Sequence, residues 1–328
     1  MMALKTILAL AALALAAATG ERPGERPVTV AALPGIVADG ARWELVLASF
    51  DSMDGIVGTA DGGILIAQEQ THSVRKLDSA GHETVFLADT HGAGSLSLDA
   101  RGHLLAVQRT CTDPGLNLGP ACLERTMVGE LAPARRMLTN SFADGRPLGR
   151  LNDLVADGKG GAWFTVEGAY HVDADGVVTV VADRDIRSNG IMLSPDGRTL
   201  YVTNNTEVLA FDVGSDGTSR NRRVFGALQG DTGADGMAID AAGRLYITGA
   251  LGVHVLGPDG RYLGLIPTPR RPIAVAFSGP DKRTLYTVQT GAVGPDGKPW
   301  TTPQGVRNNA KSIYRIPMLA EGFKGRPK

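Results

Sequence analysis

Residues 186–205, IRSNGIMLSPDGRTLYVTNN, contain two short apolar stretches on either side of a turn sequence. Ile191–Leu193 and residues 200–202 suit β-strands, and Pro195-Asp196-Gly197 suits the tight turn between them. This stretch therefore predicts a β-hairpin. Asn189 and Gly190 stand immediately before the first strand, although both residue types are poor strand formers. Their position is explained only if other parts of the chain repeat it.

The same pattern of apolar strand, Asp/Gly turn and apolar strand occurs six times along the chain. In chain order the segments are IVGTADGGILIAQ, LSLDARGHLLAVQ, LVADGKGGAWFT, IMLSPDGRTLYVT, MAIDAAGRLYITG and VAFSGPDKRTLYTV. Their turns recur at intervals of roughly 40 to 60 residues, which is typical of β-propeller blades. Second hairpins lie between them, so each period predicts four strands. The sequence therefore predicts an all-β fold, a six-bladed β-propeller with four-stranded antiparallel blades. A β-sandwich is the alternative, but it does not require this period.

One position of the repeat carries short, oxygen-bearing side chains in most blades. It lies eight residues before the turn residue of each segment, where the chain enters the innermost strand. Equivalent positions in propeller blades are related by rotation about the channel axis, so these residues should ring one mouth of the channel. In chain order they are Asp54, Gly94, Asn152, Asn189, Asp235 and Ala274.

The Asp and Asn residues of this ring predict a metal site. Carboxylate and amide oxygens suit a hard divalent cation, and the ring lacks the sulfur and imidazole ligands that Zn²⁺ prefers. A single Asn-Gly or Asp-Gly is more often a turn at the entrance of a strand. Four such residues in register are less readily explained in that way, and opposed carboxylates need a cation to offset their repulsion.

The composition places the chain among ordinary globular proteins. It has 328 residues, 43% hydrophobic and 20% charged, with a formal net charge of −1. This charge gives no reason to expect nucleic acid or an anionic membrane as a partner. Residues 1–20 combine one lysine, an apolar run and small residues, which predicts a secretory signal peptide; a membrane anchor is the alternative. We expect a lead-in over residues 21–40 and a single propeller domain over 41–328. The exported chain should be periplasmic or secreted, monomeric and free of the membrane after signal cleavage.

The two cysteines, Cys111 and Cys122, flank a loop rich in Gly and Pro. An exported chain meets an oxidising compartment, so a disulfide between them is expected, with two buried free thiols as the alternative. Neither cysteine has a histidine or a metal-type spacing beside it, which gives no support for a catalytic role. Glu69, at the end of a first-blade strand, is expected at the surface, with a position facing the site as the alternative.

Three motifs follow one another in order, RLNDLVADGKGGAWFT, SNGIMLSPDGRTLYVTN and DGMAIDAAGRLYITG, with PIAVAFSGPDKRTLYTV and SIYRI after them. In these motifs the chain resembles the SMP-30/gluconolactonase/regucalcin family of six-bladed propellers over nearly all of the mature chain. The resemblance implies one divalent metal ion at the channel mouth and hydrolysis of a sugar lactone. It also implies Asn189 and Asp235 as metal ligands, and Arg150 and Asn152 of the RLND motif as substrate-binding residues.

The chain departs from the family at the first blade, where Asp54 of MDGIV occupies the position of a glutamate ligand. We expect Asp54, Asn189 and Asp235 to hold one divalent metal ion, which could be Ca²⁺, Zn²⁺, Mn²⁺ or Mg²⁺. The resemblance further implies Asp235 as the catalytic general base and an aldonolactone as substrate. Two other functions are open: a non-catalytic propeller that binds a sugar or another ligand, and a propeller esterase or phosphotriesterase.

Overall fold

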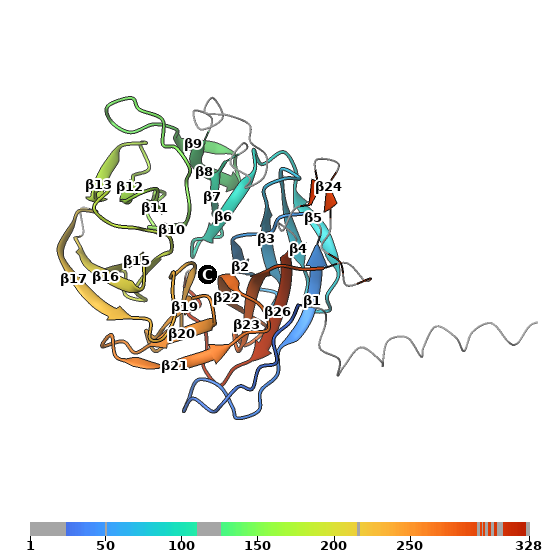
Figure 1. Ribbon diagram of the computed structural model, residues 1–328. Helices are drawn as coiled ribbons and strands as arrows, with labels where there is room; N and C mark the ends of the chain where they lie inside the picture. The colour runs from blue at the N-terminus through green and yellow to red at the C-terminus, as the bar shows by residue number, and fades with distance from the viewer. Residues whose placement is uncertain are drawn as a thin grey trace, which may run out of the picture.

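The structure is a computed structural model that describes residues 24–49, 51–109, 126–214, 217–293 and 311–325, together with residues 296, 298, 301–302 and 305–306. Residues 1–20 and the two cysteines, Cys111 and Cys122, lie outside the described residues. Six four-stranded antiparallel sheets surround a central axis (Figure 1). The predicted six-bladed propeller is therefore confirmed. Within the described ranges we find no helix with the length and apolar character needed to cross a bilayer.

The four strands of each blade are arranged in order from the channel to the rim. The innermost strands are β2 (Ile56–Gly58), β6 (Ala93–Leu98), β10 (Leu154–Ala156), β14 (Ile191–Leu193), β18 (Met237–Ile239) and β22 (Pro272–Ser278). The second strands are β3 (Ile64–Gln68), β7 (Leu104–Gln108), β11 (Ala162–Thr165), β15 (Thr199–Asn204), β19 (Leu245–Thr248) and β23 (Thr284–Thr290).

The outer half of each blade is formed by its third and fourth strands. The third strands are β4 (Ser73–Leu77), β8 (Met127–Ala132), β12 (Ala169–Val172), β16 (Glu207–Val213), β20 (Gly252–Leu256) and β26 (Lys311–Pro317). The outermost strands are β5 (Glu83–Leu87), β9 (Arg136–Thr139), β13 (Val178–Ala182), β17 (Ser219–Ala227), β21 (Tyr262–Pro267) and β1 (Glu44–Ser49). A small separate pair, β24 (Thr301–Thr302) and β25 (Gly305–Val306), lies in sequence between β23 and β26.

The N-terminal strand closes the ring of blades. β1 pairs with β26 in an antiparallel register, so the first strand of the chain completes the sixth blade beside its last strand. The side chains of Glu44 and Arg315, which are partners in this register, form an ion pair at 2.8 Å. The first and last strands of the propeller are thus held together by antiparallel pairing, which one irregularity between Leu45 and Leu47 interrupts.

The burial of each strand follows from its distance to the axis. The short innermost strands β2, β10, β14 and β18 are buried at every residue, because both of their faces pack against neighbouring blades. The outermost strands are less buried: β5 and β17 have several exposed residues, and most residues of β1 and β21 are half-buried. Apolar residues between adjacent sheets form the core, as in the cluster that joins Trp163, Phe211 and Ile247 from three consecutive blades.

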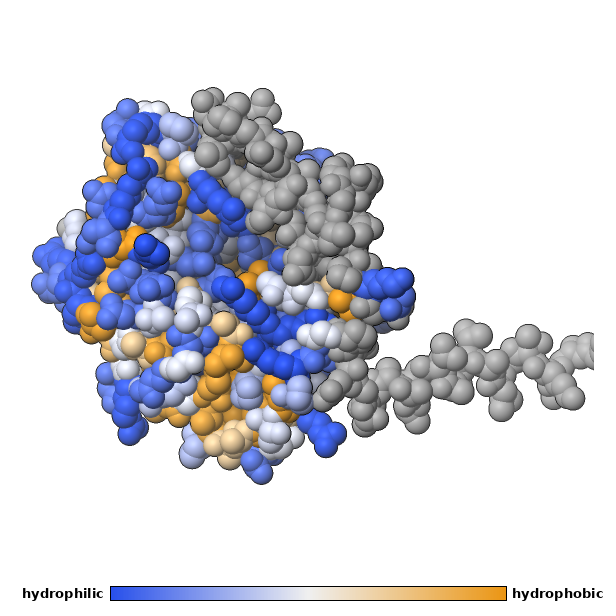
Figure 2. All heavy atoms as spheres, viewed as in Figure 1, coloured by the Kyte–Doolittle hydropathy of each residue, from blue (hydrophilic) through white to orange (hydrophobic). Residues whose placement is uncertain are grey.

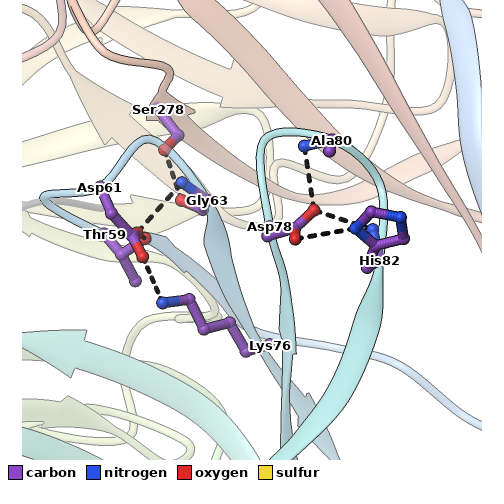
Figure 3. Close-up of polar contacts among 8 residues, drawn as sticks. All are labelled: Thr59, Asp61, Gly63, Lys76, Asp78, Ala80, His82 and Ser278. Atoms are coloured by element: carbon purple, nitrogen blue, oxygen red, sulfur yellow. Dashed lines mark hydrogen bonds and ion pairs between the residues drawn. The ribbon is translucent and has the colours of Figure 1, made fainter.

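The predicted Asp/Gly turns are stabilised by their own carboxylates, as the first blade shows (Figure 3). Asp61, in the turn between β2 and β3, accepts a hydrogen bond from the backbone N–H two residues on and pairs with Lys76 of β4. Asp78 accepts hydrogen bonds from the backbone N–H groups two and four residues on, at 2.9 and 2.8 Å. Ser278 of the sixth blade donates to the carbonyl of Gly63, which ties that blade to the first-blade turn.

Candidate functional site

The residues of the predicted ring meet at one end of the channel. Asp54, Asn152, Asn189, Asp235 and Ala274 all line a single cavity; the first four precede their innermost strands, and Ala274 lies near the start of β22. The volume of this cavity is about 20 Å³, which holds one ion or one water molecule and excludes a sugar. A larger ligand would therefore lie above it. Hydrophilic side chains predominate around the centre of the face shown in Figure 2.

The glycine after Asn189 permits the close approach of two neighbouring blades. A Cβ atom built on Gly190 would lie 2.2 Å from the backbone carbonyl oxygen of Asp235, so no larger residue fits without displacing that backbone. The same closeness occurs at Gly55 and Gly236, which follow the two aspartates of the ring. The Asn-Gly and Asp-Gly pairs therefore combine a polar side chain at the cavity with a backbone that packs directly against the next blade.

Threonines at the ends of second strands hold the ring backbone in place. Asn189 donates its backbone N–H to Thr203 Oγ1 at 3.0 Å, and its carbonyl accepts a hydrogen bond from Thr165 Oγ1 of the preceding blade. Thr248 Oγ1 contacts the carbonyl oxygens of Gly236 and Ile273 at 3.2 Å each. The sequence interpretation missed these threonines, although they recur at one strand position in AWFT, LYVT and LYIT.

Asp153, the neighbour of Asn152, joins three blades through one buried carboxylate. Its Oδ1 accepts hydrogen bonds from Ser95 Oγ at 2.5 Å and from the Leu154 N–H at 2.9 Å. Its Oδ2 accepts from the Ile191 N–H at 3.2 Å. Asp153 also lines the cavity, but with these partners its carboxylate serves chiefly to fix the ring.

The carboxyl group of Asp235 lies in an environment that disfavours its ionised form. Burial is the largest cause that raises the pKa of its carboxyl, and the negative charges of Asp54 and Asp153 raise it further, to about 8. The guanidinium groups of Arg271 and Arg109 act in the opposite direction. The cavity is therefore a place where a positive charge is favoured, because it would allow Asp235 to ionise.

A buried arginine that the sequence interpretation missed reaches the ring in the second blade. Arg109, which directly follows β7, is 3% exposed; its guanidinium pairs with Asp54 and lies 3.3 Å from a carboxylate oxygen of Glu69. It also donates to the Leu151 carbonyl at 3.1 Å. Glu69 itself is 4% exposed, so the expectation that it lies at the surface is wrong, because its charge is balanced by Arg109.

Gly94, the second-blade ring residue, leaves the space that Arg109 occupies. A Cβ atom on Gly94 would lie 2.0 Å from Arg109 Nε. Any side chain at this position would therefore collide with the arginine. The second blade thus places a cation next to the ring from the residue after its second strand, instead of an Asp or Asn before its first.

Arg150 lies apart from the cavity wall. It is exposed, stands two residues before Asn152 in the loop that leads to β10, and is absent from the residues that line the cavity. Asn152 is half-buried at the cavity itself. The structure therefore places Asn152 within reach of a ligand at the mouth and Arg150 on the surface beside it.

A larger hollow, of about 730 Å³, lies between the third and fourth blades and is lined by their hairpin turns. Its only histidine, His171, is paired with Asp157 at 2.9 Å and packs on Trp163 with ring centroids 4.2 Å apart. The carboxylate and the indole hold this imidazole within the blade. Carboxylate and amide oxygens from several blades converge on the ring cavity, whereas the histidine of the hollow is already paired within its own blade.

The residues at the ring cavity fit a single hard divalent cation. Asp54, Asn189 and Asp235 offer two carboxylates and one amide oxygen around a volume of ionic size. Burial, together with the charge of Asp54, raises the pKa of Asp235, so a bound cation would favour the ionised form of this carboxyl. No group of three or more His, Cys, Asp or Glu side chains is arranged as a metal site in the parts of the chain described, so such a cation would depend on the asparagine oxygen as well.

The fold and the ring define a six-bladed propeller with a polar site at one channel mouth. Residues 121–291, more than half of the chain, match the SMP-30/Gluconolactonase/LRE-like region, and the chain belongs to this family. Pentonolactonase XacC of Haloferax volcanii is 28% identical over 62% of this chain and 73% of its own length. Gluconolactonase of Zymomonas mobilis is 30% identical over 36% of this chain, and the alignment spans only 37% of that protein.

Solved structures show the same fold. A gluconolactonase of Xanthomonas campestris, XC5397, superposes with a TM-score of 0.68 at 22% identity, over 90% of this chain and 97% of that one. The calcium-binding protein regucalcin of Agrobacterium tumefaciens has a TM-score of 0.60 at 19% identity, over 91% and 100% of the two chains. At these identities the likeness concerns the propeller architecture alone.

Proposed function

We propose that this protein hydrolyses a lactone at the ring cavity, with a divalent cation bound by Asp54, Asn189 and Asp235. The observation that carries the proposal is the convergence of these oxygen donors on a cavity of ionic size. Family membership supports it, since proteins named pentonolactonase and gluconolactonase are among the relatives that the chain resembles in sequence. The related regucalcin structure described as calcium-binding supports a divalent cation at such a fold.

The roles of the residues follow from their places around the cavity. A bound cation would supply Lewis-acid polarisation of the lactone carbonyl. Asn152, half-buried at the cavity, hydrogen-bonds the substrate, and exposed Arg150 orients its hydroxyl groups from the rim. Asp235 Oδ accepts a proton from the attacking water and returns it to the ring oxygen when the C–O bond breaks. The products are one hydroxy acid and no other fragment.

The shape of the site limits how a substrate can approach the donors. The cavity excludes a sugar ring, so only the carbonyl end of the substrate approaches the donors while the rest stays in the open mouth. Among the described residues, the lining of the cavity includes no histidine or cysteine, and its single hydroxyl, Ser95, donates to a carboxylate of Asp153 that already accepts two backbone N–H groups. We therefore propose attack by water on an aldonolactone, without a covalent intermediate.

The test is hydrolysis of a panel of aldonolactones by protein stripped with chelator and then restored with Ca²⁺, Mn²⁺, Zn²⁺ or Mg²⁺. We expect activity that disappears on stripping and returns with at least one cation. Asp235→Asn should abolish it, whereas Asp39→Asn, at an exposed position of the lead-in, should leave it intact. Simple esters and phosphotriesters in the same panel separate the related hydrolase classes.

Two results would contradict the proposal. Full activity in chelator would show that the cation has no part in the reaction. Cation binding without turnover of any lactone or ester would favour a non-catalytic propeller that binds a sugar or other ligand.

A further inference from the structure

The positive charge of Arg109 lies beside the candidate cation site, in contact with Asp54. Its guanidinium contacts Asp54, one of the proposed ligands, and it lies close enough to Asp235 to influence that carboxyl. An arginine stays protonated in proteins, so this charge is permanent. A divalent cation that enters the cavity must therefore share Asp54 with a cation that is already present.

The arginine is fixed in this place and cannot withdraw to solvent. It is 3% exposed, Leu151 accepts a hydrogen bond from one side, and the Glu69 carboxylate lies 3.3 Å away on the other. The missing side chain of Gly94 gives it the necessary space. Since Arg109 and Glu69 are both buried, the pair belongs to the rigid frame of the ring.

From these contacts we infer that Arg109 is an internal counter-charge that competes with the divalent cation for Asp54 and sets a low affinity for it. This inference rests on the proposed function only in its choice of Asp54, Asn189 and Asp235 as donors. The affinity for the divalent cation depends on the two charges near Asp54. Arg109 lowers it by repulsion. Glu69 raises it, because it pairs with Arg109 and adds a negative charge.

The two partners therefore predict shifts of opposite sign. Arg109→Gln removes the competing charge while keeping a polar side chain, and should tighten Ca²⁺ or Mn²⁺ binding about tenfold or more. Glu69→Gln leaves the arginine charge uncompensated, and should weaken binding by about the same factor. Arg109→Lys keeps the charge and should stay close to wild type. Arg101→Gln, on an exposed second-blade turn, is the matched control.

The measurement is calorimetric titration of chelator-stripped protein with Ca²⁺ and Mn²⁺, together with the cation-induced rise in Tm. Tighter binding in Arg109→Gln and weaker binding in Glu69→Gln support the inference. Loss of binding in Arg109→Gln with its fold retained overturns it, because Arg109 would then orient Asp54 as a ligand. Equal affinities in all variants, or no binding in any of them, also overturn it. If Arg109→Gln does not fold, the shift in Glu69→Gln relative to Arg109→Lys decides.

Lactone turnover by the wild type separates this inference from the proposed function. Opposite shifts in cation affinity in a protein that hydrolyses no lactone would support the inference about Arg109 and contradict the proposed enzyme activity. Lactone hydrolysis together with a cation affinity that neither substitution changes would contradict only the inference about Arg109.

Discussion

Gly94 lies so close to Arg109 that a Cβ atom on the glycine would stand 2.0 Å from the arginine Nε. The absence of a side chain at Gly94 thus leaves room for Arg109, which directly follows the next strand, β7. The contact explains why the second blade breaks the pattern of Asp and Asn residues in the ring. It also links the fold to the charge of the site, because Arg109 pairs with Asp54.

Gly94→Ala should therefore destabilise the protein by about 2–4 kcal/mol, since the methyl group must displace a buried, charge-paired arginine. Denaturant unfolding measures the loss. The control is a double-mutant cycle with Arg109→Ala: once the arginine is shortened, adding the methyl group should cost much less. An equal cost in both backgrounds would show that the glycine is required for another reason.

Asp153→Ala should cost about 3–5 kcal/mol of stability, because it leaves buried donors from three blades without an acceptor. Ser95→Ala removes only one of these donors and should cost about 1 kcal/mol. Urea unfolding of the two variants gives both values. A small effect for Asp153→Ala would mean that neighbouring groups or water replace its carboxylate.

Lys282 gives the protein a defined pH dependence at alkaline pH. It is 7% exposed, and burial lowers the pKa of its amine from 10.5 to about 8. Between these two values the unfolded chain binds more protons than the folded one, so this residue makes stability rise with pH across that window. Below about pH 8 the cost of burying the charge is constant.

Lys282→Met removes that cost and should be more stable than wild type at pH 7, by about 1–3 kcal/mol. The difference should shrink as the pH approaches 10.5. Unfolding free energies at several pH values test this, and the tyrosines common to both proteins cancel in the comparison. A difference that does not change with pH would show that the pKa of the Lys282 amine is not lowered in the folded protein.

The repeat in the sequence was sufficient to predict the fold and the residues that share the cavity. The eight-residue offset selects Asp54, Asn152, Asn189 and Asp235, which all line the cavity. It does so because residues at the same offset in each blade occupy equivalent positions around the channel axis. Their chemical roles stay predictions. The closure of the sixth blade by β1 follows from pairing between distant chain ends, which no local pattern reveals.

The parts that the sequence interpretation missed depend on contacts between blades. Arg109 and Glu69 lie at strand ends outside the repeated motifs, and only the folded ring brings them together with Asp54. Asp153 is adjacent to a predicted site residue, but its partners Ser95 and Ile191 come from two other blades. The threonines that hold the ring backbone could have been predicted from the sequence, because they recur at one strand position.

The export and disulfide predictions concern residues outside the described structure. We expect mass spectrometry of secreted protein to show a mature N-terminus near residue 20, a position estimated from the pattern of signal cleavage sites. The Cys111–Cys122 bond should leave no free thiol in denatured, non-reduced protein. Two alkylatable cysteines under these conditions would contradict the bond, and an intact N-terminus would favour the membrane anchor.

Asn152→Ala separates substrate binding from cation binding. Asn152 lines the cavity and is half-buried, but it is outside the proposed ligand set of Asp54, Asn189 and Asp235. A lost hydrogen bond to the substrate costs about 1–3 kcal/mol, so kcat/KM for the best lactone should fall about 5- to 150-fold. The calcium affinity and the Tm should stay near wild type, because no buried partner of Asn152 is left unsatisfied. Asn189→Ala is the matched comparison: the same side chain is removed from the next blade, and here cation affinity should fall together with activity. Equal losses of cation affinity in both variants would place Asn152 among the ligands and require a different residue to bind the lactone.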